Sequence, residues 1–270
     1  MQTSFTRPGP TDDPSDSGDE RSRGELTFAS GLAPLPAPDR FCLLASEYGI
    51  EFEPGDVERL GKYLALLLAA NEVVNLTAVR RLEAAWETLI FDALTLIPLL
   101  AELEPGGHVL DVGTGGGLPG LPLAVTMPHL NFTLLDATGK KVAFVRHAIA
   151  ELGLPNARAM QARAEVLGSD AGAGERSSYD AVVSRAVGRI GVLAELTVPL
   201  AKVGGLVLMV KGERADQELA EARRALHTLQ AAHVGTVETP TGRIVVIEKR
   251  RPTPSRYPRS AQEIKKRPLL

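Results

Sequence analysis

The most informative segment of the chain is His108-Val-Leu-Asp-Val-Gly-Thr-Gly-Gly-Gly-Leu-Pro-Gly120. An apolar run ends in a loop that is dense in glycine, and glycine permits positive φ angles and lets a ligand touch the backbone. Asp136 ends the next apolar run, where a carboxylate can accept hydrogen bonds from both hydroxyls of a ribose. The loop and the acid together predict a cofactor that contains a nucleoside.

Two cofactors are compatible with this loop. Residues 115–120 fit G-x-G-x-x-G, a dinucleotide fingerprint, whereas residues 111–117 fit the D-x-G-x-G-x-G loop expected of an S-adenosylmethionine site. A dinucleotide places its pyrophosphate on free amides of the following helix, and Pro119 and Pro122 each remove one such donor. S-adenosylmethionine has no phosphate, so the prolines favour it. An NAD(P)-dependent oxidoreductase and a non-catalytic RNA-binding protein remain the alternatives.

Strand-like and helical segments alternate after residue 107. The predicted strands are 108–112, 131–136, 157–161, 179–185, 205–211, 233–238 and 243–249, and the predicted helices are 138–152 and 216–230. Repeated βαβ units imply an α/β fold with a doubly wound, mostly parallel sheet, here with an antiparallel C-terminal hairpin. Ligands of such a sheet bind outside the carboxyl ends of the strands.

The remaining chain divides into an N-terminal extension, a helical region and a basic end. Residues 1–38 contain six Pro, four Gly and five Ser, and we expect them to be disordered. Residues 39–104 contain helical patterns at 40–48, 55–70 and 82–100, whose apolar stripe must pack against the α/β core at 105–250. Residues 251–270 form the basic C-terminal tail.

Composition excludes several classes of protein. One cysteine, Cys42, rules out an intrachain disulfide, and the five histidines lack metal-ligand spacing, so we expect no metal. No apolar run approaches the about 20 residues of a membrane span, and a cytoplasmic monomer is expected. The net charge of −3 hides an asymmetry, because residues 249–270 hold eight Lys or Arg and one acid. A cationic end on an anionic body predicts nucleic acid as the partner.

Three further positions attract attention. Glu165 would follow the third strand, where it could meet the adenine end of a cofactor, and Arg185 ends the fourth strand beside the expected cofactor and substrate. Lys140 and Lys141 lie in the first turn of a helix, where the helix dipole disfavours cations, which indicates an anionic partner.

Several motifs together resemble the RsmG (GidB) family of bacterial methyltransferases. They are Asn75-Leu-Thr-Ala-Val79, the loop 111–123, Leu134-Leu-Asp136 with Lys140-Lys141, Ser184-Arg185-Ala186, and the ending Tyr257-Pro-Arg259 with residues 265–269. The resemblance covers residues 41–270. It implies a Rossmann-like class I S-adenosylmethionine-dependent methyltransferase fold and methylation of guanine N7 in 16S ribosomal RNA or the small ribosomal subunit.

The resemblance also assigns roles to residues. Cofactor-binding positions carry over to Gly113, Leu118, Asp136, Ala137, Thr138, Ala164, Glu165 and Arg185. Contacts with RNA phosphates are expected from Lys140, Lys141, Lys211, Arg256, Arg259, Lys265 and Lys266. Guanine N7 carries a free lone pair and no proton, so no general base is expected, and Arg185 is the candidate for orienting the RNA.

Overall fold

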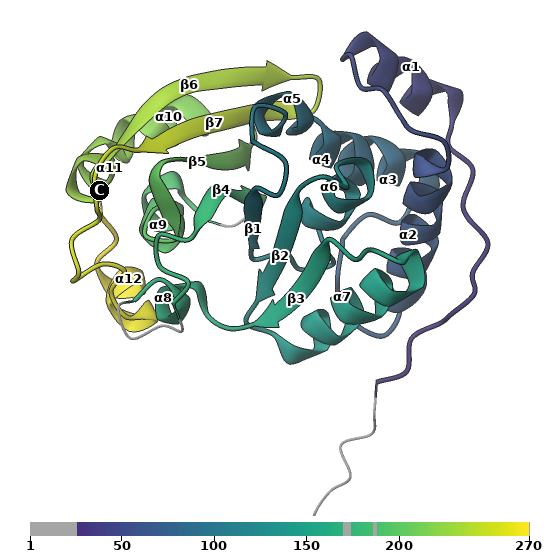
Figure 1. The fold of residues 1–270 in the computed structure, drawn as a ribbon, viewed down its shortest axis with the longest axis horizontal. Helices are drawn as coiled ribbons and strands as arrows, with labels where there is room; N and C mark the ends of the chain where they lie inside the picture. The colour runs from purple at the N-terminus through teal and green to yellow at the C-terminus, as the bar shows by residue number, and fades with distance from the viewer. Residues whose placement is uncertain (1–25, 170–173, 186–187, 270) are drawn as a thin grey trace, which may run out of the picture.

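The fold is built around a seven-stranded sheet, which the computed structural model describes within residues 26–169, 174–185 and 188–269 (Figure 1). The strand order is β3-β2-β1-β4-β5-β7-β6. The strands are β1 (His108–Val112), β2 (Asn131–Asp136), β3 (Ala157–Gln161), β4 (Tyr179–Arg185), β5 (Ala201–Lys211), β6 (Ala231–Thr239) and β7 (Gly242–Lys249). Strands β1 to β5 pair in parallel, and β7 is antiparallel to both β5 and β6. The predicted mostly parallel sheet with a C-terminal hairpin is confirmed.

The sheet order reverses at β1, which pairs with β2 on one side and with β4 on the other. Loops that leave the carboxyl ends of β1 and β4 therefore diverge and leave a crevice between them. The first four strands occupy their predicted residues, whereas β5 begins earlier than predicted, at Ala201. The crevice is where the glycine-rich loop lies.

Helices cover both faces of the sheet (Figure 1). One layer holds α6 (Gly120–Thr126) and α7 (Gly139–Leu152), and α2 (Asp56–Asn71) packs on both of them. The other layer holds α8 (Ala164–Leu167), α9 (Ile190–Thr197), α10 (Ala215–Glu221) and α11 (Arg223–Thr228), and the predicted single helix 216–230 is thus divided at Ala222. Across the described part of the chain, no helix is long and apolar enough to span a membrane.

The N-terminal helical region is more broken than its sequence pattern predicted. Its elements are α1 (Asp39–Glu47), α2 (Asp56–Asn71), α3 (Leu82–Ala85), η1 (Trp86–Phe91), α4 (Asp92–Leu94) and α5 (Ile97–Leu100). Residues 82–100, predicted as a helix interrupted at Pro98, also contain a π-helical turn, η1, directly before Asp92. π-helical turns are rare and often lie near functional sites. Asp92 is the first residue after this turn.

Residues 26–38 are an ordered part of the fold, so the prediction that disorder extends to residue 38 was wrong for this stretch. Gly31 N donates to Glu151 Oε2 at 3.2 Å and Leu35 N donates to Gly61 O at 3.2 Å. The Phe28 ring packs edge-on against Phe144, with 5.6 Å between the ring centroids. Composition predicted disorder because it does not reveal that the apolar residues of this stretch pack against helices far away in the sequence. Residues 1–25 lie outside the described residues.

The basic C-terminal segment is folded onto the α9 side of the molecule and ends in α12 (Ala261–Lys266). Ser260 caps α12 in a reciprocal capping box with Glu263. The Arg176 guanidinium donates to the carbonyl oxygens of Thr253 and Tyr257 at 2.7 and 2.6 Å. The prediction of a basic tail is therefore corrected to a docked segment, whose backbone is held by Arg176.

Arg259 belongs to this docking rather than to the free basic surface. Its Nε and one terminal nitrogen donate to the two carboxylate oxygens of Glu195 at 2.7 and 2.6 Å, and Glu195 is fully buried. These hydrogen bonds raise the pKa of Arg259 above its usual value. Lys249, also counted with the basic end, is buried in β7, where burial lowers its pKa to about 8.

We expect Arg259→Ala to lower the free energy of unfolding by about 3 kcal/mol, because it leaves the Glu195 carboxylate buried without its counter-charge. Urea unfolding followed by circular dichroism measures the change. Arg256→Ala is the matched control from the same segment, since Arg256 is exposed, and it should cost about 0.5 kcal/mol or less. Equal effects of the two substitutions would contradict the structural assignment of Arg259.

Candidate active site

The glycine-rich loop after β1 is tied to the end of β2. The backbone amides of Gly113 and Thr114 both donate to Leu135 O, at 2.9 and 3.0 Å. Gly113, Gly115 and Gly117 have φ angles of 76°, 58° and 95°, a region that other residues rarely adopt. The loop therefore needs glycine at these positions even before a ligand is considered.

One side of the loop is closed by the N-terminal helical region. A Cβ placed on Gly116 would approach Leu67 Cδ1 to 2.6 Å and Leu76 Cβ to 3.3 Å. Tyr63 of α2 donates its hydroxyl to Gly116 O at 2.8 Å. The opposite situation holds at Gly115, where a Cβ would meet no described atom nearer than 3.9 Å. The loop thus has a packed back and an open front.

Asp136 lies at that open front. Its Oδ2 accepts a hydrogen bond from Gly115 N at 3.0 Å, and its Oδ1 accepts one from Thr138 N at 2.8 Å. One carboxylate therefore joins the loop after β1 to the loop after β2. Each carboxylate oxygen has a further lone pair, so the group keeps acceptor capacity for a ligand.

Asp111, the first residue of the loop motif, is fully buried behind the glycines. Its Oδ2 accepts from Thr114 Oγ1 at 2.6 Å and from Gly120 N at 2.9 Å, whereas its Oδ1 has no hydrogen-bond partner among the described residues. Burial raises the pKa of Asp111 to about 7, although the bonds from Thr114 and Gly120 and the charge of Arg185 oppose the rise. Gly120 is a glycine for a packing reason, because a Cβ there would stand 2.8 Å from Asp111 Oδ2.

The other cofactor candidates lie on loops at the same edge of the sheet. Ala137 and Thr138 are exposed directly after β2, and Leu118 is buried within the glycine-rich segment. Ala164 and Glu165 open α8 after β3, whose end is joined to β2 by the bond from Ala162 N to Asp136 O. The carboxyl edge of the sheet thus holds the residues that the sequence singled out on β1, β2 and β3.

Arg185, at the end of β4, faces the N-terminal helical region. Its Nε donates to Asp92 Oδ2 at 2.7 Å and a terminal nitrogen donates to Thr88 O at 2.6 Å. The other oxygen of Asp92 accepts from Thr241 Oγ1, at the β6–β7 turn, at 2.5 Å. Asp92 therefore joins three parts of the chain beside the crevice, a role that was not predicted. Its one signal in the sequence is an acid that interrupts an apolar run.

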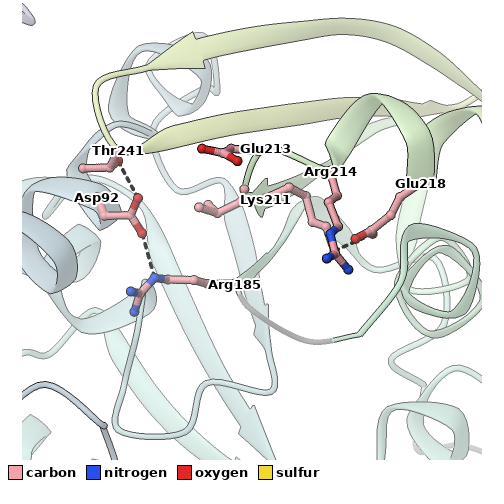
Figure 2. A pocket seen from close by; sticks show the side chains of 9 residues that line it. Asp92, Arg185, Lys211, Glu213, Arg214, Glu218 and Thr241 are labelled. Atoms are coloured by element: carbon pink, nitrogen blue, oxygen red, sulfur yellow. Dashed lines mark hydrogen bonds and ion pairs between the residues drawn. The ribbon is translucent and has the colours of Figure 1, made fainter.

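A hollow of about 380 Å³ opens beside Arg185, at the carboxyl ends of β4 and β5 (Figure 2). Its charged lining consists of Asp92, Glu213, Glu218, Arg185, Lys211 and Arg214. Figure 2 shows the Asp92–Arg185 pair on one side and Glu218 with Arg214 on the other. The hollow is large enough for a planar ring system, and Arg185, which lines it, is near enough to Asp111 behind the glycine loop for its charge to affect the pKa of that carboxyl group.

The residues expected to contact RNA come from several elements. Lys140 and Lys141 begin α7, whereas Lys265 and Lys266 end α12 and are exposed. Lys211 lies in the hollow, where its Nζ is 2.7 Å from Glu218 Oε2 and donates to Gly188 O. Arg256 is exposed, with its guanidinium carbon 5.0 Å from the centre of the Tyr257 ring. Two of the predicted phosphate contacts, Lys211 and Arg259, are thus already held by carboxylates.

No group of His, Cys, Asp and Glu side chains suited to a metal ion occurs in the described residues. The site instead offers backbone amides, carboxylates and paired cations.

The strand order, the glycine loop after β1 and the acid that ends β2 define a class I methyltransferase fold. The structure is similar to that of a methyltransferase from Geobacter sulfurreducens, with a TM-score of 0.50 and 15% identity over 78% of this chain and 98% of that one, which shows the fold alone.

The chain belongs to the GidB family, described as rRNA small subunit methyltransferase G, whose model matches residues 56–245. It is 47% identical over 225 residues to ribosomal RNA small subunit methyltransferase G of Sorangium cellulosum, covering 83% of this chain and 93% of the relative. It is 41% identical over 227 residues to the protein of the same name from Deinococcus radiodurans, covering 80% and 86%. The predicted family is confirmed, and the chain is a methyltransferase rather than an oxidoreductase.

The raised pKa of Asp111 predicts a pH dependence of stability. The pKa is about 7 in the folded chain against an ordinary value of 3.8, so between these pH values the folded state binds more protons than the unfolded state. The contribution of Asp111 to the free energy of unfolding is therefore present below pH 3.8 and is lost as the pH rises to about 7.

Asp111→Asn removes this titration while keeping an oxygen for Gly120 N. We expect the stability of the variant relative to the native chain to increase from about pH 4 to pH 7 and to level off above about pH 7, measured by urea unfolding at several pH values. A difference that stays constant over this whole range would show that the carboxyl group is not perturbed.

Proposed function

We propose that this chain transfers the methyl group of S-adenosylmethionine to N7 of one guanine in 16S ribosomal RNA. The observation that carries the proposal is the open glycine at residue 115 beside the Asp136 carboxylate, in a chain of the GidB family. The substrate is inferred from the names of the relatives, which act on small-subunit ribosomal RNA. Such a substrate places the protein in the cytoplasm, and we expect it to work as a monomer.

The donor set fits S-adenosylmethionine, which supplies a methyl group bound to a positively charged sulfur. Asp136 would accept from the ribose hydroxyls with its remaining lone pairs, while Gly113 and Leu118 would border the cofactor. The residues Ala137, Thr138, Ala164 and Glu165 would line its adenosine end. The buried Asp111 Oδ1, which has no partner among the described residues, offers an acceptor behind the loop. S-adenosylmethionine has no phosphate, so the absence of amide donors at Pro119 and Pro122 does not weaken its binding.

The chemistry asked of the side chains is positioning rather than proton transfer. Guanine N7 attacks with its own lone pair, so no side chain has to remove a proton. Holding N7 in line with the methyl–sulfur bond converts a two-body encounter into an oriented one, which can lower the barrier by several kcal/mol. Arg185, held by Asp92 and Thr88 at the crevice, would orient the RNA. The target base would enter the adjoining hollow.

Methyl transfer can be measured with ribosomal RNA or small subunits from cells that lack the gene. The purified chain and methyl-labelled S-adenosylmethionine should place one N7-methylguanine in 16S ribosomal RNA, mapped by cleavage at the modified base.

Asp136→Ala should bind the cofactor at least about tenfold more weakly, because hydrogen bonds to a charged acceptor are removed. Isothermal titration measures that affinity.

Asp136→Asn is the matched variant, since its amide oxygen retains one acceptor for Gly115 N or Thr138 N. It should bind the cofactor with an affinity between those of the native chain and Asp136→Ala. Unlabelled RNA would contradict the enzymatic proposal and favour a protein that only binds RNA. An unchanged affinity in Asp136→Ala would contradict the ribose role alone.

Phosphate contacts are proposed for the exposed Lys140, Arg256, Lys265 and Lys266 and for the partly exposed Lys141. Arg256 borders a cavity of about 510 Å³ that is also lined by Arg224, Arg259 and Arg267 and, among the described residues, by no acid. Arg224 and Arg267 are exposed. Arginines of α11 and of the docked C-terminal segment thus lie around one cavity, which suits the phosphate backbone of RNA.

Arg256→Ala should reduce the salt dependence of RNA binding. Removing one interaction with a phosphate decreases the slope of log affinity against log salt concentration by about 0.7 to 0.9. Filter binding between about 50 and 300 mM salt measures the slope. Arg146→Ala is the matched control, since Arg146 is an exposed arginine on α7, in the other helical layer. If both variants kept the native slope, the cavity would not be a phosphate site.

A further inference from the structure

The hollow beside Arg185 contains a carboxylate and an ammonium group that still have free hydrogen-bonding capacity. Glu218 Oε2 accepts from Ile190 N at 3.1 Å and lies 2.7 Å from Lys211 Nζ. Lys211 Nζ also donates to Gly188 O at 2.7 Å, so one of its three protons is unused. Within the described residues, Glu218 Oε1 makes no hydrogen bond. A free acceptor and a free donor therefore stand side by side.

This arrangement matches one nucleobase. When N7 is the reacting atom, the Watson–Crick edge of guanine remains available, and it presents the O6 acceptor next to the N1–H and 2-amino donors. Adenine presents the opposite pattern, with an amino donor at position 6 and an acceptor at N1. Enzymes that act on a base taken out of its stack read that base through this edge.

We propose that the Lys211–Glu218 pair reads the Watson–Crick edge of the target guanine. Lys211 Nζ donates to O6, and Glu218 Oε1 accepts from the 2-amino group and N1–H. Figure 2 shows Glu218 on the side of the hollow away from Arg185, so a base between them can place its Watson–Crick edge against Glu218 and leave N7 free on another edge. The inference rests on the proposed function and adds the residues that select guanine.

Glu218 suits this task better than Glu213, the other glutamate of the hollow. Glu218 is fixed by two donors and its side chain is only 17% exposed. Glu213 is exposed, and nothing in the part of the chain that the structure describes holds its carboxylate by a hydrogen bond or ion pair. An acceptor that is fixed and partly desolvated discriminates more strongly, because a base without the matching donor leaves it unpaired.

Glu218→Gln is designed to replace the free acceptor by a donor while keeping an oxygen for the two existing donors, although it also removes the negative charge opposite Lys211. Both existing donors point at Oε2, so the amide oxygen of glutamine takes that position and its NH2 group replaces Oε1. The substrates are two reconstituted 16S RNAs that carry guanosine or inosine at the methylated position. Inosine keeps N7, O6 and N1–H but lacks the 2-amino group.

The native chain should methylate the guanosine substrate about tenfold or more faster in kcat/KM than the inosine substrate, since inosine cannot donate a hydrogen bond from position 2 to the charged acceptor. Glu218→Gln should be slower on guanosine and should show less than about threefold preference between the two substrates. Glu213→Gln should keep the native preference. If Glu218→Gln is too slow for kinetics, the affinities for the two RNAs in the presence of S-adenosylhomocysteine provide the same ratio.

The remaining outcomes overturn the inference. An equal guanosine-to-inosine ratio in the native chain and in Glu218→Gln would mean that Glu218 only holds Lys211 and α9, and loss of preference in Glu213→Gln would assign the reading to the other glutamate. These results leave the proposed function intact. Native chain that places no methyl group on N7 of the guanosine substrate would contradict the proposed function itself.

Discussion

The bond between the Gly115 amide and the Asp136 carboxylate is the contact on which the site depends. It requires a backbone with positive φ after β1 and an acid at the end of β2, and it holds the two loops at the same edge of the sheet. Helix α2 supports the same loop from behind through Tyr63. The open front at Gly115 therefore exists because the back of the loop is packed, and a cofactor site on this sheet needs the N-terminal helical region as much as the strands.

Asp92 extends this dependence to the substrate side. Its two carboxylate oxygens hold Arg185 of β4 and Thr241 of the β6–β7 turn, and a π-helical turn directly precedes it. The sequence suggested a helical region at 39–104 and a core at 105–250 as separate units. The contacts show that residues of both build one crevice, so a boundary drawn at residue 104 separates groups that act together.

The local sequence pattern was sufficient to predict the strands and the glycine loop, but not the contacts between elements that are distant in the sequence. Apolar runs of strand length located β1, β2 and β4 correctly, because burial on both faces leaves a continuous apolar signature. Strand β3 lies at the edge of the sheet and is only partly buried, so its pattern in the sequence is weaker. Arg256 and Arg259 look alike in the sequence, yet only Arg259 meets the buried Glu195, which lies 64 positions away along the chain. Asp92 and Glu218 were missed for the same reason, since their partners come from other elements. Residues 26–38 were misjudged because composition does not record which surface covers a segment.

The acidic side chains around the hollow explain how positively charged side chains can lie beside a positively charged methyl donor. Methyl transfer moves a positive charge from sulfur to the purine, and an unbalanced arginine at that point would repel the charge throughout the reaction. Arg185 is balanced by Asp92, and Lys211 is balanced by Glu218. Paired in this way, the two cations keep their hydrogen-bond donors while their net field is small. A hollow that selects a base by donors and acceptors can therefore adjoin a cationic methyl donor, whereas the exposed arginines suited to phosphates lie around the C-terminal segment.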